Sequence, residues 1–224
     1  MRRFFTLLLV GALPGCNPTY APPIRGLHAG MPDRVARGQL EVGGAAGGWY
    51  LPTTGGPHVA YGYDDHVVLE AGANLNFVEG LWATGWAGVR LVRSTPLGNE
   101  LHLVGDLELG AGAGIGGRLR GETRPWTSLG TYGLYEGLGV GLRWRWFGAF
   151  LRGRLDATAS SDAPSTLWPS VLLGVEAKAG RHFVFGLAGG RGAYWNQADG
   201  VVGFWLYEAQ AAFLFDLVPV TSAP

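Results

Sequence analysis

The sequence predicts an all-β fold: a closed, antiparallel, up-and-down transmembrane β-barrel of eight to ten strands. The first observation behind this prediction is the stretch HVVLEAGANLNF, residues 66–77, where apolar residues alternate with mostly polar ones. Successive side chains of a strand point to opposite faces, so this pattern describes a strand with one apolar and one polar face. Much of the chain after residue 35 repeats the pattern, and no segment offers ten or more residues of capped helical periodicity.

The second observation is the length of the alternating segments. A strand of about 12 residues extends roughly 40 Å, and a tilt of about 40° leaves roughly 30 Å of height, enough to cross an apolar band of about 25 Å. Strands in soluble sheets average nearer to about five or six residues. We therefore expect the apolar faces to contact lipid, and in the stretch above that face consists of Val67, Leu69, Ala71, Ala73, Leu75 and Phe77.

The third observation is the mixed charge of the polar faces, which also contain many glycines. In a narrow barrel such residues can pair across the lumen, and small neighbours leave room for long Arg and Glu side chains. Unpaired charges in a narrow interior would be costly, so we expect a packed polar lumen rather than a wide pore. The predicted lumen charge network is Glu70, Arg90, Asp106, Glu108, Arg152, Arg154, Asp156, Glu176, Lys178 and Glu208.

The individual strands are predicted from the same alternation. The first segment, residues 35–50, sets Leu40 against Glu41, and residues 51–65 are expected to form a loop because Gly, Pro, Thr and Asp dominate them. Glu136 interrupts the apolar face of its segment, which predicts a bulge or a rim position there. After the loop, alternating segments cover residues 66–77, 81–93, 101–119, 132–142, 147–157, 171–179, 183–187 and 201–217.

The strand number follows from these nine segments, because a single-chain bacterial barrel has an even number of strands. If residues 101–119 divide at their glycines into two crossings, the barrel has ten strands. If residues 35–50 do not form a strand, it has eight. We favour ten.

The N-terminus predicts export. Residues 1–15 combine Arg2 and Arg3 with an apolar run that is too short to span a bilayer as a helix, which is typical of a signal peptide. Residues 17–34 hold four prolines and no periodicity. The expected organisation is therefore a signal peptide (1–15), a lipid-anchored tether (16–34), the β-barrel (35–218) and a C-terminal tail (219–224).

The end of the signal peptide, Leu13-Pro14-Gly15-Cys16, resembles the lipobox of bacterial lipoproteins. This resemblance implies cleavage before Cys16 and acylation of its sulfur, which makes membrane lipid the expected partner. Cys16 is the only cysteine of the chain, so no intramolecular disulfide is possible. In lipoproteins of this kind, Asn17 favours the outer membrane over the inner one.

The mature chain resembles bacterial outer-membrane β-barrels. The resemblance rests on the alternation, the strand length, the aromatic-rich final segment at residues 201–217, and aromatic residues at strand ends: Trp49, Tyr50, Trp144, Trp146, Trp195 and Trp205. It implies a protein of the cell outer membrane, lipid-anchored through Cys16, with a structural, adhesive or envelope-maintenance role. Two alternatives are a lipid-anchored periplasmic β-barrel that binds an apolar ligand inside, and an acyl hydrolase or transferase acting on envelope lipids.

Composition and motifs argue against most other functions. Basic and acidic residues both number 17, so nothing suggests a nucleic-acid partner, and no protein partner is indicated. Residues 112–117 match GxGxxG, but no helix can follow them, so we expect no dinucleotide and no other cofactor. The loop at residues 63–66, with His58, is a weak candidate for a metal site. His102 shares a face with Asp106 and Glu108, but no serine elbow accompanies them, so we expect no catalysis.

Overall fold

The computed structural model describes residues 22–25, 28–48, 54–77, 81–118, 127–160, 163–196 and 200–217. The predicted signal peptide, Cys16, the aromatic pair Trp49 and Tyr50, and the C-terminal tail lie outside the described residues. The strands are β1 (Gln39–Gly48), β2 (Thr54–Gly62), β3 (Val67–Asn76), β4 (Leu81–Gly98), β5 (Leu101–Arg118), β6 (Thr127–Trp144), β7 (Phe147–Ser160), β8 (Ala163–Ala179), β9 (Phe183–Asn196) and β10 (Gly200–Asp216).

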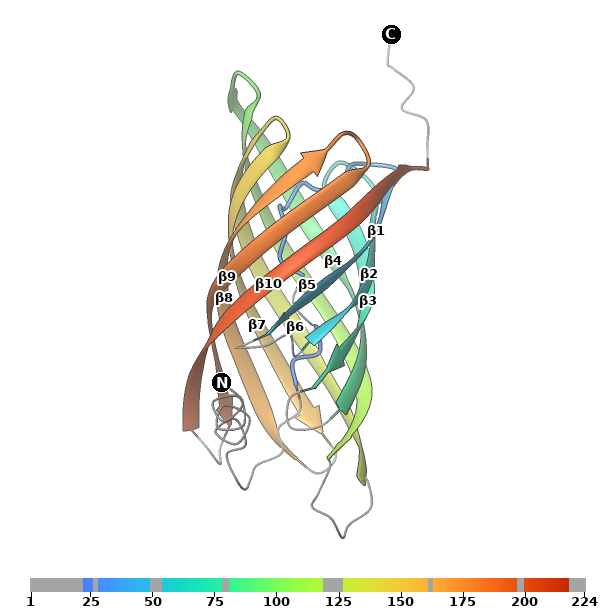
Figure 1. The fold of residues 1–224 in the computed structure, drawn as a ribbon, viewed down its shortest axis with the longest axis vertical. Helices are drawn as coiled ribbons and strands as arrows, with labels where there is room; N and C mark the ends of the chain where they lie inside the picture. The colour runs from blue at the N-terminus through green and yellow to red at the C-terminus, as the bar shows by residue number, and fades with distance from the viewer. Residues whose placement is uncertain are drawn as a thin grey trace, which may run out of the picture.

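The ten strands form one closed antiparallel barrel in which each strand pairs with its neighbours along the chain (Figure 1). Closure comes from β1, where Val42 lies opposite Phe213 of β10 on one side and opposite Val59 of β2 on the other. The predicted all-β, up-and-down barrel and the preferred number of ten strands are confirmed. In the described part of the chain, no helix is long and apolar enough to cross a membrane.

The tenth strand is not where the sequence predicted it. Residues 101–119 do not divide, because β5 runs without interruption to Arg118. The additional strand is β2, which lies within the predicted loop at residues 51–65. Its Gly-Gly-Pro run reads as a turn, but Pro57 lies at a gap in the pairing with β3, where its missing N–H costs no hydrogen bond. Pairing with β1 and β3 therefore outweighs the low strand propensity of the run.

Glu136 was expected at a bulge or a rim, and this prediction is wrong. β6 keeps unbroken register with both neighbours through Glu136, whose side chain is exposed on the outer face between Leu109 and Leu155. Register shifts occur instead between Pro96 and Gly98, and between Thr158 and Ser160, near strand ends.

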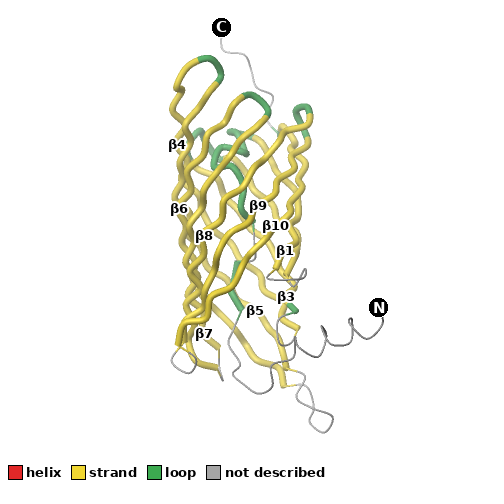
Figure 2. The backbone as a smooth tube through the Cα atoms, turned by 60° about the vertical axis from the view of Figure 1, so that its left-hand side comes forward, coloured by secondary structure: helices red, strands yellow, loops and turns green. Residues whose placement is uncertain are grey.

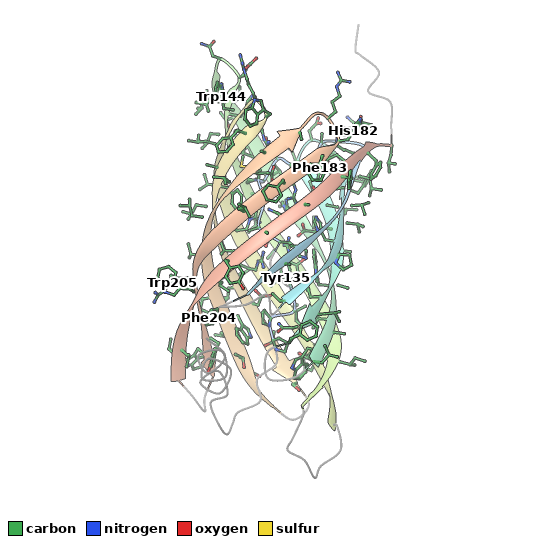
Figure 3. All side chains as sticks on the ribbon, in the orientation of Figure 1. Tyr135, Trp144, His182, Phe183, Phe204 and Trp205 are labelled. Carbon is green, nitrogen blue, oxygen red and sulfur yellow. The ribbon has the colours of Figure 1, made fainter. Side chains whose placement is uncertain are left out.

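The barrel has an apolar outside and a mixed inside, where charged and polar side chains lie beside buried apolar ones such as Phe150 and Leu172. In β3, Leu69 is 46% exposed on the outer face, whereas Glu70 is 5% exposed on the inner one, and Asn74 and Asn76 are also buried. The same alternation continues around the barrel, with aliphatic and aromatic side chains projecting outward (Figure 3). The predicted division of residues 66–77 into two faces is confirmed.

The two ends of the barrel differ. At one end, which we call the turn end, β1 begins, β10 ends, and tight turns join β2–β3, β4–β5, β6–β7 and β8–β9. Asn99 and Glu100 have positive φ angles of 37° and 67°, as a two-residue type I′ hairpin requires. At the opposite end, which we call the linker end, β1, β3, β5, β7 and β9 end and the strand that follows each of them begins.

The residues before β1 lie inside the barrel. We call residues 22–25 and 28–34 the inserted segment; Ile24, Ala29 and Met31 are completely buried, and Arg25 is 1% exposed. Figure 2 shows described loop backbone running within the ring of strands. This part of the chain was predicted to be a tether outside the folded domain, and for these residues that interpretation is wrong. The segment itself is aperiodic, so its own residues did not predict a position inside the barrel.

Candidate functional site

The inserted segment follows the barrel axis. Near the linker end, the Ile24 carbonyl accepts hydrogen bonds from Asn74 Nδ2 at 3.2 Å and from Thr84 Oγ1 at 3.1 Å. Near the turn end, Asp33 Oδ1 lies 2.7 Å from Nε of Arg143, two residues before the β6–β7 turn. The segment therefore runs from the linker end to the turn end before the chain reverses into β1.

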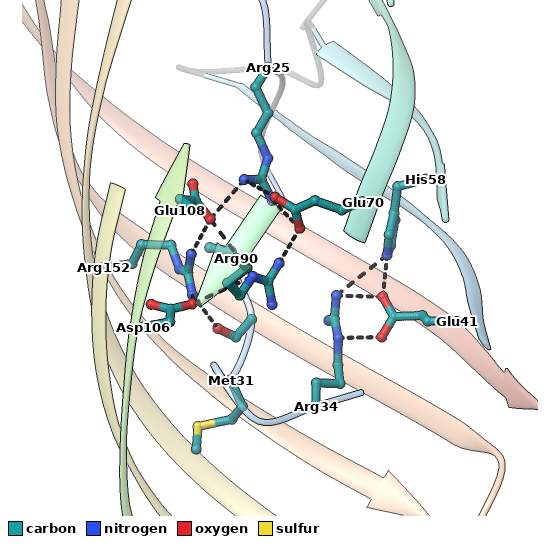
Figure 4. Close-up of polar contacts among 12 residues, drawn as sticks. Arg25, Met31, Arg34, Glu41, His58, Glu70, Arg90, Asp106, Glu108 and Arg152 are labelled. Atoms are coloured by element: carbon teal, nitrogen blue, oxygen red, sulfur yellow. Dashed lines mark hydrogen bonds and ion pairs between the residues drawn. The ribbon is translucent and has the colours of Figure 1, made fainter. Parts of the chain in front are cut away.

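Arg25 makes the first set of charged contacts. Its Nη1 atom lies 2.7 Å from Glu70 Oε1 and 2.7 Å from Glu108 Oε2 (Figure 4). Its guanidinium carbon lies 4.6 Å from the ring centre of Trp86 and 5.1 Å from that of Tyr135. Two carboxylates and two aromatic faces thus surround one fully buried guanidinium, a setting in which both ionic and cation–π attraction are strong.

Strand residues complete the cluster around Arg25. Arg90 Nη2 donates to Glu70 Oε2 at 2.5 Å, and Arg90 Nε lies 3.5 Å from Asp106 Oδ2. Arg152 contacts Asp106 at 2.5 Å and also binds Glu108. Arg154 Nε lies 3.2 Å from Glu108 Oε1. Because each carboxylate touches more than one guanidinium, the wall charges form a connected network.

Arg34 makes the second set of contacts, nearer the turn end. It binds Glu41 through two parallel contacts, with Nε 2.6 Å from Oε2 and Nη2 2.7 Å from Oε1 (Figure 4). Its Nη1 donates to Gln210 Oε1 at 2.8 Å and lies 3.4 Å from Glu176 Oε2. His58 also contacts Glu41. A two-point pair of this kind fixes the orientation of Arg34 as well as its charge.

Wall side chains also bind the backbone of the inserted segment, which has no strand partner to satisfy its peptide groups. The Ala29 N–H donates to Glu208 at 2.9 Å, and the Met31 N–H donates to Glu176 at 3.0 Å. Similar contacts join Arg25 N–H to Asp156 at 3.4 Å and Lys178 Nζ to the Arg34 carbonyl at 3.2 Å. Buried peptide groups need such partners, so these carboxylates hold the segment in place.

His28 is the remaining ionisable group buried on the inserted segment. Its ring centre lies 4.6 Å from that of His58 and 5.5 Å from that of Trp86. The guanidinium groups that the segment brings to the wall carboxylates are those of Arg25 and Arg34.

All ten residues of the predicted charge network face the lumen, and they divide into two groups. Arg90, Asp106 and Arg154 contact other wall residues in the ion pairs described above. The other seven also contact the inserted segment: Glu70, Glu108, Arg152, Asp156, Glu176, Lys178 and Glu208.

Sequence reasoning missed several partners, namely Arg25, Arg34, Glu41, His58, Arg143 and Gln210. One signal could have revealed the first two. Among the ten predicted residues there are six carboxylates and only four cations, so two positive charges had to come from elsewhere.

Apolar contacts also shape the lumen to the segment. A Cβ atom placed on Gly148 of β7 would lie 2.7 Å from Met31 Sδ, closer than van der Waals contact allows. Gly153, on the outer face of the same strand, has no atom within 4 Å of such a Cβ.

We therefore expect Gly148→Val to displace Met31 and loosen the segment, while Gly153→Val leaves it in place. Limited proteolysis of the refolded protein, with mapping of cuts in residues 22–34, measures this difference. Equal protection in both variants would contradict the proposed fit.

The remaining candidate sites do not assemble. Asp64 Oδ1 accepts hydrogen bonds from the N–H groups of His66 at 2.7 Å and Val67 at 2.8 Å, so it caps the β2–β3 turn, while His58 faces the lumen. In the described ranges, no three His, Cys, Asp or Glu side chains converge to hold a metal ion. The GxGxxG match lies within β5, where a Cβ on Gly112 would collide with Ile24.

The structure does bring a serine to His102. Ser94 Oγ lies 3.4 Å from His102 Nδ1 at the exposed turn end. Asp106 and Glu108 share the face of His102, as predicted, but they lie further along β5, where they are buried in the lumen and bound to Arg152. Within the described residues no carboxylate contacts His102, so the pair lacks the third group that orients a catalytic base.

No known protein family matches the chain, and no curated protein matches it. Among solved structures, the chain is similar to the N-terminal β-barrel domain of Pseudomonas aeruginosa OprF, with a TM-score of 0.44. The sequence identity is 10%, and the alignment covers 80% of this chain and 98% of that one. It is also similar to a bacterial polysaccharide outer membrane secretin, with 10% identity, coverage of 79% and 98%, and a TM-score of 0.27. Similarities this weak identify no family and no function.

Proposed function

We propose that the protein is an outer-membrane β-barrel lipoprotein with a structural, adhesive or envelope-maintenance role, and that its lumen is closed by its own N-terminal segment. The observation that carries this proposal is the apolar outer face. Between the two ends, the outer face exposes many aliphatic side chains, with Glu136 as a charged exception: Leu69, Leu107, Leu109, Leu134, Leu138, Leu151, Val171, Leu173 and Leu187. A soluble protein rarely exposes so continuous an apolar surface, whereas a bilayer requires one.

Exposed aromatic residues flank this aliphatic band. Trp144, Trp146, Phe213 and Phe215 lie near the turn end, and Phe77, Tyr132, Trp195 and Trp205 lie nearer the linker end. Figure 3 shows Trp144 and Trp205 projecting outward at different heights of the barrel. Aromatic belts at two levels are the pattern of side chains at the two membrane–water interfaces.

The filled lumen supports a role without transport in this conformation. The inserted segment occupies the interior along its course, and it binds charged wall residues through Arg25 and through Arg34. A barrel with charged groups paired inside and aliphatic groups outside can serve as a stable membrane anchor.

We also propose that Cys16 carries the lipid anchor, and the direction of the inserted segment bears on its location. The segment leads toward the linker end as it approaches residue 22. Cys16 precedes that residue by six positions, a span of at most roughly 20 Å. The acyl chains would therefore enter the leaflet at the linker end, so lipid and strands would fix the barrel in the same bilayer.

The two alternative functions fit the geometry less well. A barrel that binds an apolar ligand inside needs an open apolar cavity, but here charged side chains line part of the interior and the inserted segment lies within it. An acyl hydrolase or transferase needs an oriented base, and His102 contacts Ser94 without an acid.

Membrane association of full-length Cys16→Ser protein tests the proposal, because this variant cannot be acylated at that sulfur. We expect it to float with lipid vesicles and to change its gel mobility on heating, since the strands alone should span the bilayer. Mature Cys16→Ser protein that stays soluble without detergent would contradict the membrane-spanning part. Mass spectrometry of the wild-type N-terminal peptide separately tests acylation, and an unmodified Cys16 would contradict only the lipid anchor.

A further inference from the structure

We propose that the inserted segment closes a latent cation-selective pathway, which conducts when the segment leaves the lumen. This inference rests on the proposed membrane-spanning barrel and adds an activity to its structural role. It depends on three features: the charge of the wall, the contacts that hold the segment, and the course of the segment.

The wall without the segment is negatively charged. Its lumen-facing carboxylates outnumber its Arg and Lys residues by seven to five: Glu41, Glu70, Asp106, Glu108, Asp156, Glu176 and Glu208 against Arg90, Arg143, Arg152, Arg154 and Lys178. The segment adds Arg25 and Arg34 with Asp33, which brings the interior close to neutrality. Its departure would therefore leave an excess of carboxylates, and pores lined by Asp and Glu favour cations.

The excess would be concentrated at particular residues. Glu41 has its guanidinium contact from Arg34, and the Ala29 N–H donates to Glu208. Glu70 would keep Arg90. Withdrawal would thus remove the Arg34 guanidinium from Glu41, which would keep its contact with His58, and the Ala29 N–H from Glu208. Water and mobile cations would replace the lost partners.

The contacts that hold the segment can be exchanged without breaking the barrel. The hydrogen bonds described for Ile24, Arg25, Ala29 and Met31 go to wall side chains, and the first backbone bridge joins Arg37 to Gly62, after the segment. Each strand pairs with two neighbouring strands, and no described residue of the segment belongs to this pairing. Release therefore costs side-chain contacts but no strand pairing.

The course of the segment defines the pathway. Ile24 is bound near the linker end and Asp33 near the turn end, and the buried residues between them fill the interior. A segment that leaves this course vacates a continuous route along it.

Single-channel recording with full-length protein in planar lipid bilayers tests the proposal. We expect wild type to be almost always closed, and the double variant Arg25→Gln, Arg34→Gln to raise the open fraction by roughly tenfold or more, because both charged attachments are weakened. In a KCl gradient, its reversal potential should show selectivity for K⁺ over Cl⁻. Arg145→Gln is the matched control, since Arg145 pairs with Glu100 at the exposed turn end.

A second double variant distinguishes the effect of wall charge on K⁺ selectivity from the effect of a loosely held segment. Glu41→Gln with Glu208→Gln also removes attachments of the segment, so it should open more often than wild type, but with weaker K⁺ selectivity. A merely destabilised barrel would give the same selectivity in both double variants. If the Arg25→Gln, Arg34→Gln protein does not fold, Arg25→Lys with Arg34→Lys replaces it, because lysine keeps the charge but loses the two-point contact.

The outcomes are distinguishable. Inserted, heat-modifiable protein that stays closed in all double variants would overturn the pathway but leave the membrane barrel intact. Anion-selective or non-selective openings would overturn the assigned charge. Freely conducting wild type would overturn closure by the segment, and protein that never inserts would contradict the proposed function itself.

Discussion

Replacing Arg34 by Gln is expected to destabilise the plugged barrel by about 3–5 kcal/mol, because it leaves the buried Glu41 carboxylate without its guanidinium. Glu41 is completely buried, and both of its oxygens contact Arg34. Urea unfolding of the refolded protein in lipid vesicles, followed by tryptophan fluorescence, measures the change. Glu41→Gln should lower the stability of the plugged barrel by a similar amount, because it leaves the buried Arg34 guanidinium without its carboxylate partner.

The double variant Arg34→Gln, Glu41→Gln distinguishes this pair from general damage. Its cost should be clearly less than the sum of the two single costs, because neither charge remains unpaired. Arg145→Gln removes an exposed pair and should change stability by at most about 1 kcal/mol. Strictly additive single costs would show that Arg34 and Glu41 do not depend on each other.

Replacing Leu173 by Arg is expected to lower the stability of the barrel in vesicles by about 2–4 kcal/mol, because it puts a charge into the hydrocarbon region. Leu173 is 65% exposed on the outer face, in the middle part of β8 and opposite Leu151. The same urea titration measures the loss. In a soluble barrel, an arginine at so exposed a position would have almost no effect.

Leu97→Arg is the matched control, because Leu97 is also more than half exposed but lies beside the β4–β5 turn. Its cost should be about 0–1 kcal/mol, as for charges near an interface. Equal effects at positions 97 and 173 would contradict an aliphatic band between two interfaces.

The alternation of residues was a reliable guide to the barrel wall, and the reason is local. Each inward or outward direction follows from strand geometry, so a clean period of two in residues 66–77 was sufficient to assign both faces. Glu136 was the instructive exception. It breaks the chemical pattern without breaking the register, because the pairing of β6 with β5 and β7 determines where the side chain points.

β2 could not be predicted from its own residues. Gly55, Gly56 and Pro57 are typical of a turn, and only Val59 and Tyr61 hint at alternation. The strand exists because β1 and β3 present unpaired backbone groups on either side of it, and a closed barrel leaves no free edge. Strand propensity depends on this context more than helix propensity does.

The sequence alone determined the all-β class, the two-faced strands and the charged lining, because alternation and charge are encoded residue by residue. Only the tertiary structure decided that Arg25 and Arg34 lie inside the lumen, since the chain before β1 has no periodicity to indicate its position. The physical reason is long-range: a wall with more carboxylates than cations stabilises a segment that brings two arginines. That imbalance was present in the sequence, but closure of the barrel was needed to turn it into a binding site.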